Sequence, residues 1–444
     1  MLCCFGSETS ALVPRPARVA RVDARVFARL SASRGALGPL GAFAGGATPA
    51  TVLSCCAGAL LPMLSTGDVL PLRATCREAK AAIAQHPWED SETVIYGRLR
   101  DWRACFPRAR TANLRSLQYM WRWAWRSLRV SPLADADFVY LAGLRTLCIA
   151  GREELTDAAF AHLRGIHTLD ISRCRQVGIT DADFAHLAGI HTLRMSECGL
   201  EGLTDAAFAH LRGIHTLDMS DCWRMGITDA AFAHLRGIHT LDMSWCNQAG
   251  ITDAAFAHLR GIHTLNMRGC RHGGVTDAAF AHLGGIHTLI MSECSQVGVT
   301  DAAFAHLRGI HTLNMSWCNQ EGITDAAFAH LAGIHTLDMH SCTQTSITDA
   351  AFAHLRGIHA LNMQDCNQAG ITDAAFVHLR GIHTLNMSHC WQEGISDAAF
   401  AHLHGIHTLK MGLCGQEGIT DAALCALTRH SHAGYECLQA IGRQ

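Results

Sequence analysis

The chain of 444 residues lacks both a strong net charge and a long apolar run. Its 36 Lys and Arg residues nearly balance its 38 Asp and Glu residues, so the formal net charge is -2. A charge of that size attracts neither nucleic acid nor an anionic membrane surface. The longest apolar stretch, residues 51–64, is too short to span a bilayer and is interrupted by Pro62. These absences predict a cytoplasmic or nuclear protein that binds no nucleic acid and no membrane.

Clustered metal ligands and an activated nucleophile are also missing. Eleven of the 20 cysteines form one column that recurs every 24 residues, from Cys174 to Cys414. One cysteine per 24 residues does not supply the short C-x₂₋₄-C spacing of a zinc site. Two further columns, His162 to His402 and His167 to His407, contain 22 of the 29 histidines. Because these columns account for 11 of the cysteines and 22 of the histidines as parts of the repeat, we expect no nucleophile with a positioned base. The sequence predicts a protein that is not an enzyme and has no metal or cofactor.

A 24-residue unit, close to ITDAAFAHLRGIHTLNMSWCNQEG, recurs without a gap from Leu155 to Gly418. A fixed period in the twenties indicates a solenoid, in which each unit buries its apolar face only against its neighbours. A degenerate unit at residues 133–154 precedes the eleven full units, and a partial unit ends at Leu427. Arrays of this kind usually present a binding surface rather than a catalytic pocket.

Each unit is predicted to form a strand, a turn, a short helix and a second turn. The L-x-x-L-x-L spacing of Ile166, Leu169 and Ile171 is typical of a short strand that enters a turn. Thr180 is suited to cap the following helix, because its hydroxyl can accept from a free backbone N–H group. Gly189 permits a left-handed turn before the next strand.

The histidine column from His167 to His407 occupies the start of each predicted strand. Neighbouring strands lie about 4.8 Å apart, so neighbouring imidazoles should be about 5 Å apart. Protonation of adjacent members would place like charges side by side, which disfavours the charged form. We therefore expect pKa values below the usual value near 6.5, and a loss of stability as the pH falls.

The repeat resembles the cysteine-containing class of leucine-rich repeats. Units of that class read L-x-x-L-x-L-x-x-C, followed by I/L-T-D and a helix, and the likeness extends over residues 133–427. Methionine replaces leucine at Met195 and in later strands, and the units are slightly shorter than is usual in the class. The resemblance implies an α/β solenoid, a leucine-rich-repeat horseshoe of about eleven units with strands on the concave face and helices on the convex face.

Variable positions in this nearly invariant array mark where single units differ. They form two columns that are predicted to point away from the buried face of the strand, because strand side chains alternate. Aromatic residues are enriched at binding hot spots, so Trp245 and Trp317 are candidate anchors for a target protein. Neutral drift on a solvated face is the alternative. The predicted partner-binding residues are Asp170, Arg194, Glu197, Asp218, Asp221, Asp242, Trp245, Asn266, Glu293, Asn314, Trp317, Asp338, Asp365 and His389.

Residues 48–90 precede the array and resemble an F-box, a small helical module. The likeness rests on an apolar helix, a turn that carries Asp before Val, an L-R-x-x-C-R segment and a terminal Trp. An F-box-like module followed by cysteine-type repeats resembles the substrate receptors of cullin–RING (SCF-type) ubiquitin ligases. The resemblance implies that other subunits transfer ubiquitin to the bound target. The residues implied to dock a ligase adaptor are Leu60, Leu64, Asp68, Val69, Leu72 and Trp88.

Two alternatives to the ligase hypothesis remain open. The helical segment can be a cap that covers the end of the solenoid, and the whole chain can be an interaction or structural scaffold without a ligase link. Residues 1–47 are Arg-rich and poor in acids, which indicates a disordered tail or an organellar targeting segment. The predicted domains are 1–47 as this tail, 48–90 as the F-box-like module, 91–132 as a helical linker and cap, 133–428 as the repeats, and 429–444 as a C-terminal tail.

Overall fold

The computed structural model describes residues 61, 64–73, 77–116, 133–152, 156–174, 178–415 and 418–420. The predicted tails at residues 1–47 and 429–444 lie outside these ranges. The chain divides into two compact units, residues 1–176 and residues 177–444, so the division falls within the predicted repeat array. None of the helices in the described ranges has the length and apolar character that a membrane-spanning helix needs.

The first unit begins with helices that pack around buried side chains. Val69 of the first helix and Ala79 and Ile83 of the second are fully buried. The Trp88 indole is also buried, and its Nε1 donates to the Ile83 carbonyl at 2.8 Å. This bond ties the segment that follows the second helix back onto that helix. The helices are α3 (Thr66–Arg73), α4 (Arg77–Gln85) and α5 (Leu99–Cys105).

Three parallel strands complete the first unit. Thr111 lies opposite Thr146, and Thr146 lies opposite Thr168, so the strands pair in register. The first of these strands lies in the segment 91–132, where no repeat pattern marks it in the sequence. The strands are β1 (Thr111–Asn113), β2 (Thr146–Cys148) and β3 (Thr168–Asp170). The helical turns beside them are η3 (Asp135–Leu141), α6 (Asp157–Phe160) and η4 (Ala161–Leu163).

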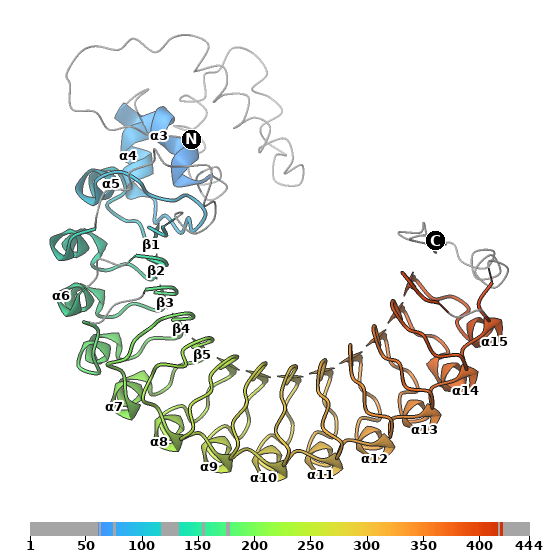
Figure 1. Cartoon of the computed structure of the whole chain (residues 1–444). Helices are drawn as coiled ribbons and strands as arrows, with labels where there is room; N and C mark the ends of the chain where they lie inside the picture. Colours follow the sequence, from blue (N-terminus) through green and yellow to red (C-terminus); the bar gives the residue numbers. More distant parts are fainter. Residues whose placement is uncertain are drawn as a thin grey trace, which may run out of the picture. The chain divides into compact units, whose positions relative to one another are not determined.

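The second unit repeats the predicted order of strand, turn, helix and turn. Its described strands are three residues long and pair in parallel with their neighbours in chain order. Within this unit the strands line the inner side of an arc and the helices lie on its outer side (Figure 1). The strands are β4 (Thr192–Arg194), β5 (Thr216–Asp218), β6 (Thr240–Asp242), β7 (Thr264–Asn266), β8 (Thr288–Ile290), β9 (Thr312–Asn314), β10 (Thr336–Asp338), β11 (Ala360–Asn362), β12 (Thr384–Asn386) and β13 (Thr408–Lys410).

The helices of the second unit are short, and most consist of the four residues DAAF. Phe304, at the end of one of them, is fully buried, as are Leu313 and Met315 of the neighbouring strand segment. The helices of this unit are η5 (Asp183–Leu187), α7 (Asp205–Phe208), η6 (Ala209–Leu211), α8 (Asp229–Phe232), α9 (Asp253–Phe256), α10 (Asp277–Phe280), α11 (Asp301–Phe304), α12 (Asp325–Phe328), α13 (Asp349–Phe352), α14 (Asp373–Phe376), η7 (Val377–Leu379) and α15 (Asp397–Phe400).

The predicted helix cap is confirmed in the repeats from Thr204 to Ser396, where it also joins neighbouring repeats. At Thr180 the prediction was wrong, because its hydroxyl and its amide both donate to Asp183 Oδ2 and its side chain caps no helix. Thr300 Oγ1 accepts from Ala302 N at 3.3 Å and so caps α11. The same hydroxyl donates to Asp277 Oδ2 of the preceding repeat at 2.7 Å, and Thr300 N donates to Asp277 Oδ1 at 2.7 Å. Ser396 makes the same contacts with Asp373. From Asp181 to Asp397, the Asp of each repeat therefore binds the equivalent Thr or Ser of the next repeat.

The cysteines of the repeat column are buried thiols that donate to the backbone. Cys222 Sγ donates to the Met195 carbonyl of the preceding repeat at 2.9 Å, and Cys366 Sγ donates to the Met339 carbonyl at 3.0 Å. Burial raises the pKa of Cys222 to about 12, so the thiol stays protonated and remains a donor. In the part of the chain that the structure describes, no three His, Cys, Asp or Glu side chains are grouped so that they could hold a metal ion.

Candidate partner-binding surface

The first variable column lies at the last residue of each strand, and most of its side chains hold the next turn. Asp242 Oδ1 accepts from Ser244 N at 2.9 Å and from Ser244 Oγ at 2.7 Å. Such an Asx turn explains why Asp and Asn dominate this column. Exposed Arg194 is an exception. The predicted residues that accept from the amide two positions later are Asp170, Asp218, Asp242, Asn266, Asn314 and Asp338.

The second variable column lies in the turn after each strand. Its non-glycine members have left-handed backbone, with φ between 53° and 63°. This conformation costs an L-residue about 1–2 kcal/mol and favours glycine, which occurs in this column at Gly269. The non-glycine members are Arg173, Glu197, Asp221, Trp245, Glu293, Trp317, Ser341, Asp365, His389 and Leu413.

These turns form a surface on the second unit that we call the post-strand surface, defined by the second-column residues from Glu197 to Leu413. Its members differ widely in size and charge, although the turn geometry alone would favour glycine. Trp245 is 38% exposed and Trp317 is 52% exposed. Two positions further along the same turns, Trp223 and Trp391 are also exposed. Exposed aromatic side chains gathered on one kind of turn are typical of a binding surface.

Trp245 lies against the backbone of the next repeat. A Cβ atom built on Gly269 would lie 2.5 Å from Trp245 Cε3, so the indole occupies the space that the missing side chain leaves. The same relation holds between Trp391 and Gly415. The sequence analysis missed both glycines, which stand 24 residues after the tryptophans and could have been found by comparing adjacent repeats. This packing holds Trp245 in place before any partner binds.

A polar cluster surrounds Trp317 where the repeats depart from their consensus. His340 takes a position usually occupied by Ser, and its ring meets Trp317 edge-on with centroids 5.6 Å apart. His340 Nε2 lies 3.3 Å from Asp365 Oδ2, and Gln364 Nε2 donates to the same oxygen at 3.1 Å. His389 Nδ1 lies 3.9 Å from Asp365 Oδ1. The structure therefore brings together three predicted residues, Trp317, Asp365 and His389, with two that the sequence analysis missed.

Other predicted residues stand apart from this cluster. Glu293 accepts from Arg268 at 2.6 Å and forms an ion pair on the same kind of turn. Asp221 is exposed and Glu197 is half-buried, both in turns of the second unit. Asp170 belongs to the first unit. The predicted partner-binding residues are thus distributed over many repeats.

Four of the six predicted adaptor-binding residues have structural roles in the described part of the first unit. Leu64, Val69 and Trp88 are buried, with exposed fractions of 7%, 0% and 1%. Asp68 Oδ2 accepts from Ser65 N at 3.0 Å and from Ser65 Oγ at 2.8 Å, beside the start of α3. Leu60 and the side chain of Leu72 lie outside the described residues.

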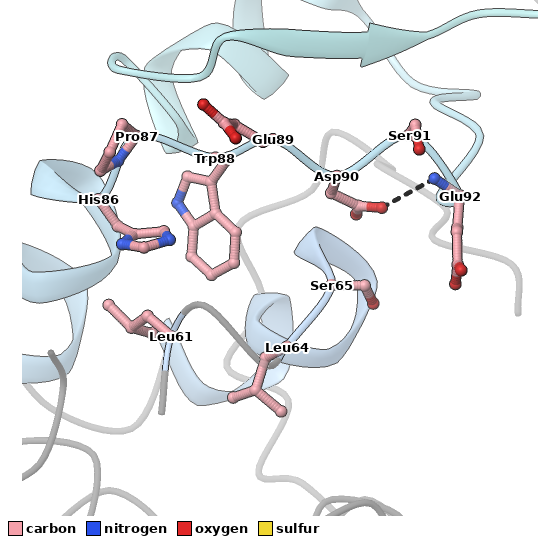
Figure 2. A pocket seen from close by; sticks show the side chains of 10 residues that line it. All are labelled: Leu61, Leu64, Ser65, His86, Pro87, Trp88, Glu89, Asp90, Ser91 and Glu92. Atoms are coloured by element: carbon pink, nitrogen blue, oxygen red, sulfur yellow. Dashed lines mark hydrogen bonds between the residues drawn. The ribbon is translucent and has the colours of Figure 1, made fainter. Parts of the chain in front are cut away.

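A cavity of about 520 Å³ opens beside Trp88 in the first unit (Figure 2). The His86 ring meets the Trp88 ring edge-on, with centroids 4.6 Å apart. Asp90 Oδ2 accepts from Thr66 N at 2.7 Å and from Thr66 Oγ1 at 2.6 Å. Burial alone would raise the pKa of Asp90, but the hydrogen bonds from Thr66 and Thr93 lower it below its usual value. The cavity is lined by Leu61, Leu64, Ser65 and residues 86–92.

No protein-family model matches the chain, and no curated protein matches it in sequence. A Drosophila structure of the Toll–Spatzle complex matches with a TM-score of 0.50 and 17% identity over 66% of this chain and 43% of that chain. The glycosylated form matches with a TM-score of 0.51 and 15% identity over 70% of this chain and 46% of that chain. An internalin from Listeria monocytogenes has a TM-score of 0.45 and 16% identity over 64% of this chain and 91% of that chain.

The chain spans less than half the length of the chains that it matches in the two Toll–Spatzle structures. At such low identities a likeness shows the fold and nothing further. The parallel strands in chain order, the 24-residue period and the likeness to these two structures establish that the chain has the leucine-rich-repeat fold.

Proposed function

We propose that the chain is a non-catalytic interaction protein that binds a target protein on the post-strand surface of its second unit. The observation that carries the proposal is the second variable column. Its turn favours glycine, yet ten repeats place non-glycine side chains there. Because backbone geometry does not explain those side chains, contact with another molecule is the better explanation. The fold supports such a role, since the matched Toll structures are those of a complex with Spatzle.

Two parts of the surface offer different anchors. Trp245 is fixed against Gly269, so its binding to an apolar pocket of the partner costs little side-chain entropy. The ring of His340 contacts both exposed Trp317 and the carboxylate of Asp365, and so places these two groups near each other. An aromatic face beside a carboxylate suits a Lys or Arg side chain of the partner, which can make a cation–π contact and an ion pair. We expect a target that presents an apolar group and a basic group.

The test begins with capture of partners by the full-length chain and identification of the captured proteins. A purified partner is then titrated with wild type, with the Trp245→Ala, Trp317→Ala double variant and with Val377→Ala. Val377 is an exposed apolar residue on the helix side, where other repeats carry Ala. Each tryptophan is expected to contribute about 2 kcal/mol, so the double variant, which loses about 4 kcal/mol, should bind roughly 1,000-fold more weakly. Val377→Ala should bind like wild type, and undiminished affinity of the tryptophan variant would refute the proposal.

A narrower proposal makes the chain a substrate receptor of a cullin–RING (SCF-type) ubiquitin ligase, with residues 48–90 docking the adaptor. The order of the segments along the chain supports this proposal, because α3 and α4 precede the repeats and are followed by the buried Trp88. The burial of Leu64 and Val69 means that an adaptor would have to meet other side chains of this segment. The rim of the cavity beside Trp88 offers Glu89 and Glu92. The alternative is a scaffold with no ligase link.

A pull-down with a purified ligase adaptor separates these two versions. The ligase version predicts capture of wild type and loss of capture by Leu64→Asp, Leu72→Asp. Because Leu64 is buried, that variant needs a melting curve as a folding control. Glu89→Lys, Glu92→Lys provides a second variant whose substitutions lie at the cavity rim. Failure of the folded wild-type chain to capture the adaptor would exclude the ligase version and leave the scaffold.

A further inference from the structure

The connections from each helix to the next strand carry a concentrated set of basic side chains. Each connection has seven residues, such as 258–264 with the sequence HLRGIHT. The ten connections of the second unit, from residues 186–192 to residues 402–408, contain 21 His and six Arg, and neither Asp nor Glu. We call these connections the basic edge. The chain as a whole has a net charge of -2, so its acids are concentrated elsewhere.

The strand-side histidines of the basic edge form a stacked ladder from His191 to His335, whereas the His335–His359 and His359–His383 ring pairs are edge-on and tilted. From His215 to His335, neighbouring ring centroids are 4.5 Å apart with interplanar angles between 11° and 13°. This spacing confirms the prediction of about 5 Å. Each ring face is covered by the next ring, and the Nδ1 atom of His239 lies 3.1 Å from Thr240 Oγ1. Nε2 is therefore the ring nitrogen that can meet a ligand.

Arginines and the helix-side histidines form a second ladder on the same edge. Arg236 Nε lies 3.2 Å from His258 Nδ1 of the next repeat, and donates to it. The pairs Arg212–His234, Arg260–His282, Arg308–His330 and Arg356–His378 repeat the contact. A guanidinium group has five N–H donors, so this bond leaves others for a ligand. Arginine donors suit phosphate oxygens because the planar fork can bind two of them at once.

Protonation of the histidines makes this edge more positive. The ten connections contain no carboxylate that would neutralise the added charge. The pKa of His239 is lowered by desolvation and by the charges of His215 and His263, its neighbours in the ladder. The Arg and His residues of the helix-side ladder add positive charge on the same edge. Protonation of a helix-side imidazole at Nδ1 would also remove the acceptor of the Arg–His bond. A bound anion would compensate both effects, so anion binding and proton uptake should be coupled.

We propose that the basic edge binds inorganic polyphosphate, and binds it more tightly as the pH falls below 6.5. The ligand has to be linear, because the donors follow a line of ten repeats that is roughly 40 Å long at strand spacing. Single-stranded nucleic acid is disfavoured because its bases need aromatic faces to stack on, and the imidazole faces here cover one another. A chain of phosphates has only acceptors and needs no such platform.

The first experiment measures the affinity of the purified full-length chain for polyphosphate by isothermal titration calorimetry at pH 7.5 and pH 5.5, at one ionic strength. Affinity should be at least tenfold higher at pH 5.5. Binding should take up protons, which shows as a dependence of the measured heat on the ionisation heat of the buffer. Log affinity should fall with log salt at both pH values, and more steeply at pH 5.5 where more cations engage phosphates. Affinity that does not change between the two pH values would overturn the proposal.

Charge-matched variants locate the site. Arg236→Gln, Arg260→Gln, Arg308→Gln should weaken binding at least tenfold at both pH values. The control Arg224→Gln, Arg268→Gln, Arg271→Gln removes the same charge from exposed residues of the post-strand turns, and its affinity should stay within twofold of wild type. Equal losses in the two variants would show a general charge effect and overturn the proposal. A melting curve at each pH checks that both variants are folded.

Histidine variants and competing polymers complete the test. His239→Asn, His263→Asn, His287→Asn should gain less affinity for polyphosphate than wild type when the pH is lowered from 7.5 to 5.5. Tighter binding of single-stranded DNA or heparin than of polyphosphate, at equal charge concentration, would assign the edge to that polymer and refute the present assignment. The Trp245→Ala, Trp317→Ala variant should bind polyphosphate like wild type, so this proposal and the protein-binding proposal can fail separately.

Discussion

Replacement of Thr300 by valine tests the contact that links neighbouring repeats. Valine keeps the branched shape of the side chain but has no hydroxyl. The variant loses the hydrogen bond from Thr300 Oγ1 to Asp277 Oδ2, which is 2.7 Å long, and the cap on Ala302 N, which is 3.3 Å long. The bond from Thr300 N to Asp277 Oδ1 is retained. The substitution therefore removes both hydrogen bonds made by the Thr300 side chain.

The expected loss of stability follows from these two contacts. A hydrogen bond to a charged group contributes about 1.5–3 kcal/mol and an N-cap about 1 kcal/mol. Thr300 is half-buried, so water replaces part of the lost interaction. We expect Thr300→Val to destabilise the chain by about 2 kcal/mol. Thr300→Ser keeps the hydroxyl, as Ser396 does in its repeat, and should change stability by less than about 0.5 kcal/mol.

Urea unfolding followed by circular dichroism measures both variants. Hydrogen exchange at the Ala302 amide reports the cap locally, which is necessary because long repeat arrays can unfold in parts. Exchange at Ala302 should accelerate in Thr300→Val and stay unchanged in Thr300→Ser. Equal stability of the two variants would refute the reasoning that the Thr–Asp contacts couple the repeats.

Three further predictions concern the core, the histidine ladder and the cysteines. Phe304→Ala should cost about 3–5 kcal/mol in urea unfolding, because the ring is fully buried and its removal leaves a cavity. The melting temperature should fall between pH 7 and pH 5.5, and fall less in added salt, since the lowered pKa values of His239 and His287 mean that the unfolded chain binds protons first below about pH 6.5; a flat profile would contradict this. Cys222, whose pKa is about 12, should react with a thiol reagent at pH 8 only after unfolding, as peptide mass spectrometry can measure.

The repeated part of the fold was predictable because every repeat supplies the same signals. The L-x-x-L-x-L spacing placed the strands, and the Thr–Asp pair placed the helix starts. The 24-residue period also predicted that equivalent residues such as His239 and His263 would be neighbours. Strand β1 was not found, because its three residues precede the periodic region and carry no pattern of their own.

The geometry of the candidate surface was less predictable. Residues such as Trp245 and Glu293 have no intrinsic preference for left-handed backbone, so their turn was not apparent from the sequence. The contact between His340 and Asp365 joins residues 25 positions apart, one more than the period, and depends on the direction in which each side chain leaves its turn. The burial of Val69 could not be deduced from a family resemblance, since the same motif position can face a core or a partner.

Hydrogen–deuterium exchange of the full-length chain with and without a purified target protein tests the central claim most directly. Binding on the post-strand surface should slow exchange in the turns that carry Trp245 and Trp317, at residues 242–248 and 314–320. Exchange in the helix-to-strand connections, such as residues 258–264, should stay unchanged. Protection confined to those connections or to the outer helices, with the turns at Trp245 and Trp317 unaffected, would contradict the account.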